Sequence, residues 1–385
     1  MGGNKGDRKS YKATSSAKAA EALAAKGAGT AGFGGFSGLR PVAGFGFGAP
    51  VAAAAAGGAA AADPLELSAQ LDGDFAQCLR HLSKRDTTTK MKALQNLREL
   101  IPQKTAADLA LLLQPWGYQI KKLLLDPSKA VRSEAAAIMA AVGSAVGKGL
   151  LPQLKGLLGP WYLACFDPYP DAAGAAKRSL AEVFPGKKQA DALLYCRSEV
   201  LGHICSCLAA TPQSLGDARK DTPEELEERH ERITAASLSA AAALLSTLQQ
   251  QEQEQQQDAA ASAAAAAAVE EVSCKLDEVL QAPGFFKKQL GSKSVVVRRA
   301  AYGLVRSLAA GTPQLLRGCQ AAAAPAVLGA LQEKDASNHP AMWEMLLAFI
   351  TSQQPDCWAA INMQKAFSPR LLALSSSSSR GRRGW

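Results

Sequence analysis

Two stretches far apart in the chain repeat one pattern: a polar turn, then Val-Arg, then alanines. The first runs from Asp126 to Ala135 and the second from Gly291 to Ala301. In stacked helical repeats such a pattern forms the turn and the second helix of a unit, where the valine packs inward and the arginine reaches along the neighbouring unit. Small residues let the paired helices close up. The repeated pattern therefore favours a solenoid over a helical bundle with one core.

Composition agrees with helices packed against helices. Hydrophobic residues make up 48% of the chain and aromatic residues only 6%, and much of the apolar content is alanine, the best intrinsic helix former. Segments dense in Val, Ile, Thr and Tyr are missing, which argues against a large sheet. We predict an all-α fold, a HEAT/armadillo-like helical-repeat solenoid with a disordered N-terminal tail.

Apolar residues at helical spacing predict a series of helices from about residue 67 onward. Prolines fall between these helices or in their first turns, where a missing N–H costs least, and Pro115 is expected to separate two of them. The expected helices span residues 67–82, 88–100, 107–113, 116–125, 129–146, 150–166 and 172–184.

Shifts in composition divide the chain into five parts. The segment 248–268 is expected to be a low-complexity insertion between helices, although it could instead extend a helix as a solvated rod. The five parts are a flexible basic tail rich in Gly, Phe and Ala (1–62), N-terminal HEAT-like repeats (63–247), the Gln/Ala insertion (248–268), further HEAT-like repeats (269–374) and a frayed or truncated end (375–385).

Charge points to an anionic partner without naming it. The formal net charge is +9, which suits ribosomal RNA or an anionic membrane surface. Glycines surround Phe33 and Phe36 in the tail, and such a segment cannot build a core. It is either a plain linker or a segment that orders only against a partner.

Residues that carry enzyme chemistry are sparse. The chain has four histidines and no phosphate-binding loop, dinucleotide-binding glycine motif or nucleophile elbow. Cys196, His203, Cys205 and Cys207 lie close in sequence, but their spacing does not match structural zinc sites, so buried helical thiols are the preferred interpretation. We therefore predict no catalytic residue and no metal site. Cysteines without C-x-x-C spacing and the lack of a secretory signal favour the cytosol.

One basic cluster is a candidate phosphate site. Exposed cations beside hydroxyl groups and a helix N-terminus suit a phosphate, although a solvated basic turn capped by Asp86 or a threonine explains the same residues. The acidic run from Glu224 to Glu231 is most simply a charged first helical turn. The candidate contact residues are Arg80, Lys84, Arg85, Thr87, Thr88, Lys90 and Lys92.

Several motifs, in one order along nearly the whole chain, carry a family resemblance. They include Leu82-Ser83-Lys84-Arg85-Asp86-Thr87-Thr88-Thr89-Lys90-Met91-Lys92-Ala93-Leu94, Gly32-Phe33-Gly34-Gly35-Phe36, Pro160-Trp161-Tyr162, Phe285-Phe286-Lys287-Lys288 and Pro340-Ala341-Met342-Trp343-Glu344. Each motif alone is weak, but their colinearity is specific. The chain resembles the N-terminal region of listerin, the RING-type E3 ubiquitin ligase of ribosome-associated quality control.

The resemblance implies a function and partners. Listerin-like ligases bind large ribosomal subunits that carry peptidyl-tRNA, beside a tRNA-binding quality-control factor, and ubiquitinate the stalled nascent chain. These residues contain no RING, so a ubiquitin-conjugating enzyme would be recruited only through a RING that they lack, and zinc is expected only there. The chain is expected to be inactive alone and to bind no cofactor or membrane. The basic cluster, with Phe33 and Phe36, becomes the set of candidate docking residues.

Two rival functions stay open. A generic HEAT-repeat scaffold with no ubiquitin role would bind protein, insensitively to salt and without the tail. An RNA-binding repeat protein outside quality control would bind naked RNA about as well as ribosomes.

Overall fold

The computed structural model describes residues 71–217, 221–254 and 259–353, and a few positions between 356 and 372. These residues all belong to the larger of two compact units, residues 47–385. Within this described part of the chain every regular element is a helix, so the predicted all-α class is confirmed.

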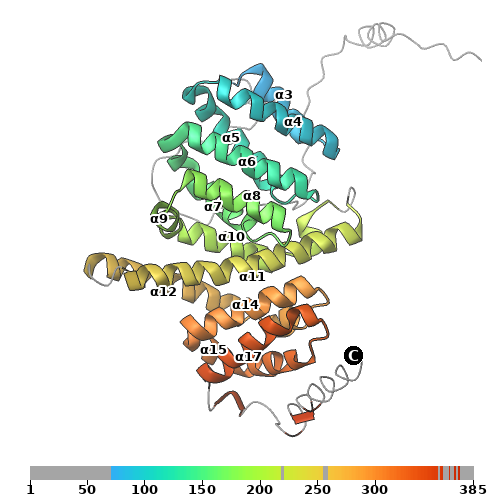
Figure 1. The fold of residues 1–385 in the computed structure, drawn as a ribbon, viewed down its shortest axis with the longest axis vertical. Helices are drawn as coiled ribbons and strands as arrows, with labels where there is room; N and C mark the ends of the chain where they lie inside the picture. Colours follow the sequence, from blue (N-terminus) through green and yellow to red (C-terminus); the bar gives the residue numbers. More distant parts are fainter. Residues whose placement is uncertain are drawn as a thin grey trace, which may run out of the picture. The chain divides into compact units, whose positions relative to one another are not determined.

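Short turns join most of the helices into pairs (Figure 1). The α-helices are α3 (Gly73–Leu82), α4 (Thr87–Leu100), α5 (Ala106–Leu123), α6 (Lys129–Val146), α7 (Leu151–Ala164), α8 (Pro170–Val183), α9 (Lys187–Tyr195), α10 (Arg197–Ala209), α11 (Pro223–Glu254), α12 (Ala259–Leu280), α13 (Phe285–Leu290), α14 (Val295–Gly311), α15 (Pro313–Gly318), α16 (Gln320–Gly329) and α17 (His339–Gln353). Short 3-10 helices are η1 (Ile101–Gln103), η2 (Gly147–Leu150), η3 (Pro212–Leu215), η4 (Ala330–Gln332), η5 (Ala336–Asn338) and η6 (Asp356–Trp358).

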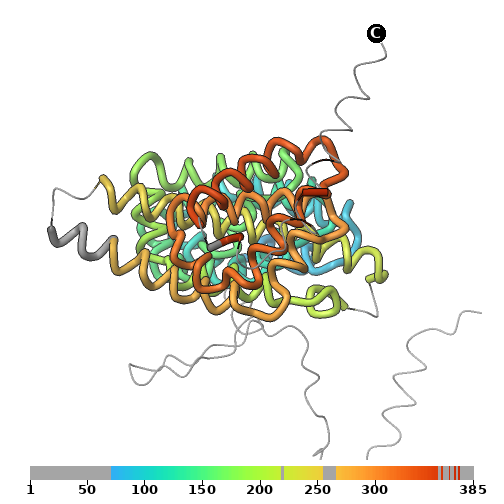
Figure 2. Tube along the Cα trace, turned by 90° about the horizontal axis from the view of Figure 1, so that it is seen from below, coloured from blue at the N-terminus to red at the C-terminus, as the bar shows by residue number. Residues whose placement is uncertain are grey.

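The pairs stack on one another in two layers. In one layer α4 packs on α6 and α6 on α8, and further along α11 packs on α14 and α14 on α17; in the other layer α5, α7, α10 and α12 follow one another. Viewed along the stack, successive pairs overlap (Figure 2). The stacked pairs form a HEAT/armadillo-like helical-repeat solenoid.

The repeated sequence pattern takes the predicted roles. Val131 and Val297 are buried at the start of α6 and α14, and the alanines that follow them are buried too. Arg132 and Arg298, directly after the valines, reach carboxylates 35 residues further along the chain. The sequence echo therefore marks two equivalent repeat units.

Pro115 does not separate two helices, because α5 runs through it without a break. A proline inside a helix lacks the N–H of one backbone hydrogen bond, which costs about 3 kcal/mol. Leu112, Leu113, Trp116 and Ile120 are fully buried on either side of it, and each such side chain contributes about 1.5–3 kcal/mol. Packing across the proline therefore outweighs its local cost.

The Gln/Ala stretch was expected to lie between helices, and that expectation is wrong for its described residues. Residues 248–254 continue α11 and residues 259–268 begin α12, so the helical alternative holds there. Leu248 and Gln251 are buried, and the C-terminal end of α11 extends beyond the other helices (Figure 1). The residues extend two repeat helices.

One stretch of the described residues, Lys129–Ala164, is long and apolar enough to cross a membrane by length and composition. It consists of α6, η2 and α7, and Gly147 breaks it with a positive φ of 57°. Its large side chains, among them Ile138, Met139 and Trp161, are buried against neighbouring helices. Core helices of a folded protein are often as long and as apolar as a membrane span. The burial of these side chains identifies α6 and α7 as two such core helices.

Candidate functional site

The predicted basic cluster lies around the junction of α3 and α4: Arg80 is in the last turn of α3, Lys84 and Arg85 are in the turn itself, and Lys90 and Lys92 are in α4. We call residues 80–92 the basic turn. The Asp86 side chain caps α4, because Oδ2 accepts hydrogen bonds from the Thr89 N–H at 2.7 Å and from the Thr89 hydroxyl at 2.6 Å. These hydrogen bonds from Thr89, hydroxyl first, lower the pKa of Asp86. A carboxylate thus already fills the position that a phosphate would take at this helix N-terminus.

Most cations of the basic turn are free to meet a ligand. Arg80, Lys84 and Lys92 are exposed, and no carboxylate lies within ion-pair distance of them in residues 71–217, 221–254 and 259–353. Thr87 and Thr88 are exposed beside them. The junction of α3 and α4 thus carries three exposed ammonium or guanidinium groups and two hydroxyls, which are donors suited to phosphate oxygens.

Lys90 lies differently from its neighbours. Its Nζ contacts Asp126 Oδ2 at 2.5 Å, and the two side chains are only 15% and 5% exposed. Asp126 belongs to the turn between α5 and α6, so the pair joins the first two repeats. Lys90 is therefore a link between repeats, and its ammonium group is engaged by Asp126.

Arg85 faces the start of α11. Its Nη2 is 3.7 Å from Glu225, and both side chains are well exposed. Thr222 and Glu225 form a reciprocal capping pair there, because the Thr222 N–H donates to the Glu225 carboxylate and the Glu225 N–H donates to the Thr222 hydroxyl. The first two acidic residues, Glu224 and Glu225, thus lie in the first turn of α11 as the sequence predicted, and the rest of the run follows in the next turns of the helix. Arg85 has a nearby carboxylate with which a phosphate would compete.

An arginine clamp recurs at α6 and α14. Arg132 donates through Nε to Asp167 at 2.7 Å and through Nη1 to the Asp126 and Pro127 carbonyls at 2.7 and 2.9 Å. Arg298 donates to Glu333 at 2.7 and 2.6 Å. Its Nη1 donates in the same way to the carbonyls five and six residues before it.

The sequence indicated these arginines but not their acceptors. The sequence signal that could have located the acceptors is a constant spacing. The fourth position of a helix is occupied by Lys90, Arg132 and Arg298, and their carboxylate partners follow 36, 35 and 35 residues later. One repeat length separates donor from acceptor.

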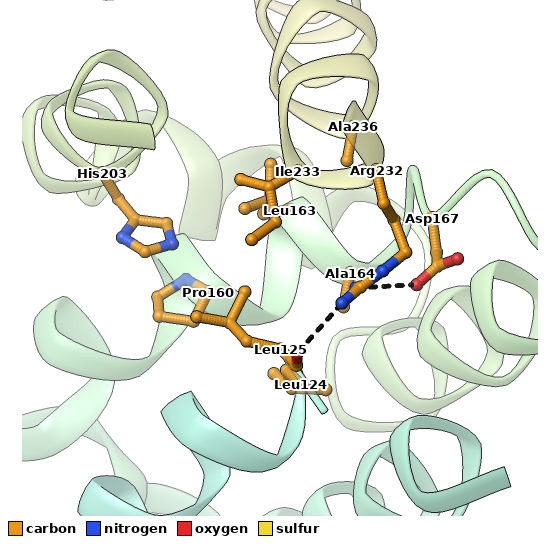
Figure 3. A pocket seen from close by; sticks show the side chains of 10 residues that line it. All are labelled: Leu124, Leu125, Pro160, Leu163, Ala164, Asp167, His203, Arg232, Ile233 and Ala236. Atoms are coloured by element: carbon orange, nitrogen blue, oxygen red, sulfur yellow. Dashed lines mark hydrogen bonds and ion pairs between the residues drawn. The ribbon is translucent and has the colours of Figure 1, made fainter. Parts of the chain in front are cut away.

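Arg232 closes a buried junction between α11 and two turns (Figure 3). Its Nη2 donates to the Leu125 carbonyl at 2.9 Å, and its Nη1 lies 3.7 Å from Asp167. Burial, together with nearby Arg132, lowers the pKa of Arg232 to about 10, so it stays charged at neutral pH. The adjoining cavity, between Leu163 and His203, has about 20 Å³ of space. That holds about one water, which excludes it as a substrate pocket.

The cysteine and histidine cluster is split by the fold. Cys196 and Cys207 are buried and Cys205 is half-buried, and burial raises the pKa of Cys207 to about 12. Burial, aided by nearby Lys121, lowers the pKa of His203 to about 4, and its ring lies 3.8 Å from the Cys207 sulfur. Among the described residues no group of three or more His, Cys, Asp or Glu side chains could hold a metal ion.

The other candidate docking residues, Phe33 and Phe36, lie outside the described residues. The same holds for the whole tail (1–62) and for the end (375–385).

Solved structures of repeat proteins are remotely similar to this chain. A designed armadillo repeat protein in complex with the peptide (KR)4 is 18% identical with a TM-score of 0.31, covering 71% of this chain and 98% of that one. The stacked pairs, the repeated Val-Arg pattern and the clamps define the class of protein, an α-solenoid of the HEAT/armadillo type.

Sequence comparison identifies the family of the chain. Residues 67–384 match the family "E3 ubiquitin-protein ligase listerin, N-terminal domain", and the chain belongs to it. E3 ubiquitin-protein ligase listerin from Mus musculus is 31% identical over 318 residues, and its counterpart from Gallus gallus is equally similar. The match covers 82% of this chain but only 17% of either relative. The listerin of Drosophila melanogaster is 32% identical over 163 residues.

Proposed function

We propose that this chain is the ribosome-docking arm of a listerin-like E3 ubiquitin ligase that acts on stalled nascent chains in ribosome-associated quality control. The observation that carries the proposal is the basic turn, where Arg80, Lys84 and Lys92 are exposed without a carboxylate partner among the described residues, in a chain of the listerin family. Phosphate contacts of this kind dominate binding to RNA.

The partners follow from the proposal. The arm binds the large ribosomal subunit with its peptidyl-tRNA in the cytosol, beside a tRNA-binding quality-control factor. A ubiquitin-conjugating enzyme is recruited through a RING elsewhere in the longer ligase, so these residues need no cofactor and stimulate no ubiquitin discharge alone. Because Asp86 already caps α4, the exposed side chains make the phosphate contacts.

Co-sedimentation tests the proposal against its rivals. The chain is centrifuged with free large subunits, with peptidyl-tRNA-bearing large subunits, with small subunits and with purified ribosomal RNA. Salt-sensitive binding to large subunits that exceeds binding to the naked RNA is expected. Equal binding to naked RNA would favour an RNA-binding repeat protein, and folded chain that binds none of them would leave a generic protein-binding scaffold.

A matched pair of variants identifies the surface. Arg80→Gln/Lys84→Gln/Lys92→Gln is expected to weaken large-subunit binding. Lys129→Gln/Lys187→Gln/Lys188→Gln removes the same charge from exposed positions on α6 and α9 and is expected to bind like the unaltered chain. Equal weakening by both triplets would mean that net charge rather than the basic turn drives binding.

A further inference from the structure

Two exposed tyrosines and three lysines lie on α5, α7 and α9. We call Tyr118, Lys121, Lys122, Lys155 and Tyr195 the tyrosine–lysine band. Tyr118 is 52% exposed and Tyr195 is 59% exposed. Exposed aromatic rings that lie beside cations are the kind of surface on which bases stack.

Each tyrosine ring has a lysine against it. Lys122 Nζ lies 4.0 Å from the centroid of the Tyr118 ring and donates to its hydroxyl at 2.9 Å. Lys155 Nζ lies 5.3 Å from the Tyr195 ring centroid. These contacts hold the lysine ammonium groups beside the rings rather than leaving them to move independently.

The band is continuous and adjoins the basic turn. α5 and α7 pack together, and the Lys121 ammonium lies 3.8 Å from where a side chain on Gly156 of α7 would begin. At the other side of α5, Gln119 donates to the Ser83 hydroxyl at 3.1 Å, and Ser83 lies within the basic turn. A ligand bound to the basic turn could therefore continue along the band.

The charge of the band is positive. α7 contains no Asp or Glu, and in α5 the acidic residue is Asp108, which is engaged in the capping box with Thr105 at the N-terminus of the helix. α9 contains one acidic residue, Asp191, against Lys187 and Lys188. Glu199 of α10 faces the band and pairs with Lys155 at 3.0 Å, which raises the pKa of Lys155. This pair offsets one lysine and leaves Lys121 and Lys122 in excess.

We propose that the tyrosine–lysine band binds single-stranded RNA, with bases stacked on Tyr118 and Tyr195 and phosphates held by the lysines. Exposed aromatic rings interleaved with cations are the platform that single-stranded nucleic acid uses, because an unpaired base offers its face for stacking. Bases in a duplex are already stacked on one another, so a duplex meets only the lysines. The inference rests on the proposed function for the source of the RNA, but binding itself is a property of the band.

The test uses the full chain and a fluorescent octauridylate, whose length falls within the usual range of about 4–16 nucleotides per site. Binding is followed by anisotropy at several salt concentrations. Tyr118→Ala and Tyr195→Ala are each expected to weaken binding about 5- to 150-fold, since stacking on one aromatic is worth about 1–3 kcal/mol. Tyr118→Phe and Tyr195→Phe keep the ring and are expected to bind within about twofold of the unaltered chain.

Three further measurements make the outcome decisive. Lys121→Gln/Lys122→Gln/Lys155→Gln should lower the slope of log affinity against log salt by about 2, at about 0.7 for each phosphate contact. A duplex RNA should be insensitive to the Tyr→Ala changes. Circular dichroism should show that these exposed substitutions leave the helices intact.

The proposal is overturned if Tyr→Ala leaves octauridylate binding unchanged, or if Tyr→Phe weakens it as much as Tyr→Ala. Loss of octauridylate binding in the Tyr→Ala variants, with large-subunit binding still lost in Arg80→Gln/Lys84→Gln/Lys92→Gln, supports both inferences. If the tyrosine changes have no effect on octauridylate binding but Arg80→Gln/Lys84→Gln/Lys92→Gln still loses large-subunit binding, the proposed function stands and RNA binding by the tyrosine–lysine band is refuted.

Discussion

The arginine clamps of α6 and α14 share their local geometry and differ in what surrounds the carboxylate. At α6, Asp167 accepts from Arg132 and also lies 3.7 Å from Arg232, so two arginines share one carboxylate. All three side chains are no more than 8% exposed. Removing that carboxylate would leave two buried cations unpaired.

At α14, Glu333 serves one arginine and several neutral donors. Besides Arg298, it accepts from the Tyr302 hydroxyl at 2.8 Å, the Asn338 amide at 3.2 Å and the Asp335 N–H at 3.0 Å. The difference shows that one repeat motif can be completed either by a second cation from a distant helix or by polar groups of its own helix and turn. The first solution ties α11 to earlier repeats, and the second rigidifies a single turn.

The largest effect is expected for Asp167→Asn. Breaking a buried ion pair from one side costs about 3–5 kcal/mol of unfolding free energy, because the remaining charges stay buried without compensation. Urea denaturation followed by circular dichroism measures it. Asp171→Asn is the control, since Asp171 is 79% exposed and forms an exposed pair with Lys129 at 3.5 Å, and it should change stability by less than about 1 kcal/mol.

A smaller effect is expected for Glu333→Gln. The amide keeps the shape and one acceptor oxygen, so the loss is about 1.5–3 kcal/mol, the range for hydrogen bonds to a charged group. Glu344→Gln is the matched control, because Glu344 is 57% exposed and pairs with Arg306 near the same helices. Equal denaturation midpoints for the two variants would contradict the buried network.

Acid should weaken the α14 clamp through Glu333. Burial alone would raise the pKa of Glu333, but hydrogen bonds from Arg298, the Asp335 N–H, Tyr302 and Asn338 hold it far below the usual value of 4.5. A group with a lowered pKa in the folded state stabilises the fold above its unfolded pKa and loses that contribution as pH falls. Stability should therefore drop below about pH 4.5, and less steeply in Glu333→Gln. If the stability of the unaltered chain and of Glu333→Gln fell equally with pH, Glu333 would not be the group responsible.

The smallest effects separate the lysines of the basic turn. Lys90→Gln should cost about 1–3 kcal/mol, because Asp126 loses its partner in a largely buried position. Lys92→Gln, on an exposed side chain, should stay within about 0.5 kcal/mol. Thermal unfolding of the two single variants makes the comparison. A larger loss for Lys92→Gln would reverse the assignment of structural and exposed lysines.

Much of the solenoid could be predicted because it depends on local pattern. Val131 and Val297 mark inward positions at the start of a helix, and prolines and capping residues mark many ends. Pro115 was misjudged because long-range packing of its neighbours decides whether a helix continues. The end of α11 was misjudged for a similar reason, since burial of Leu248 and Gln251 comes from other helices.

The residues of the candidate site could be predicted from the sequence, but the directions in which their side chains point could not. Lys84, Lys90 and Lys92 look alike in sequence, and only the position of Asp126 one repeat later shows which of them turns inward. Tyr118 and Tyr195 carry no mark in the sequence that separates them from core aromatics such as Tyr162. Their exposure follows from the stacking of α5, α7 and α9.

We expect the exposed cations of the basic turn, and not Lys90, to contact RNA on the large ribosomal subunit. The most direct test is the salt dependence of large-subunit binding for the unaltered chain, Arg80→Gln/Lys84→Gln/Lys92→Gln and Lys90→Gln. The triple variant should lower the slope of log affinity against log salt by about 2–3, at about 0.7–0.9 per lost phosphate contact. Lys90→Gln should leave the slope unchanged. An unchanged slope in the triple variant, with the protein folded, would contradict the account.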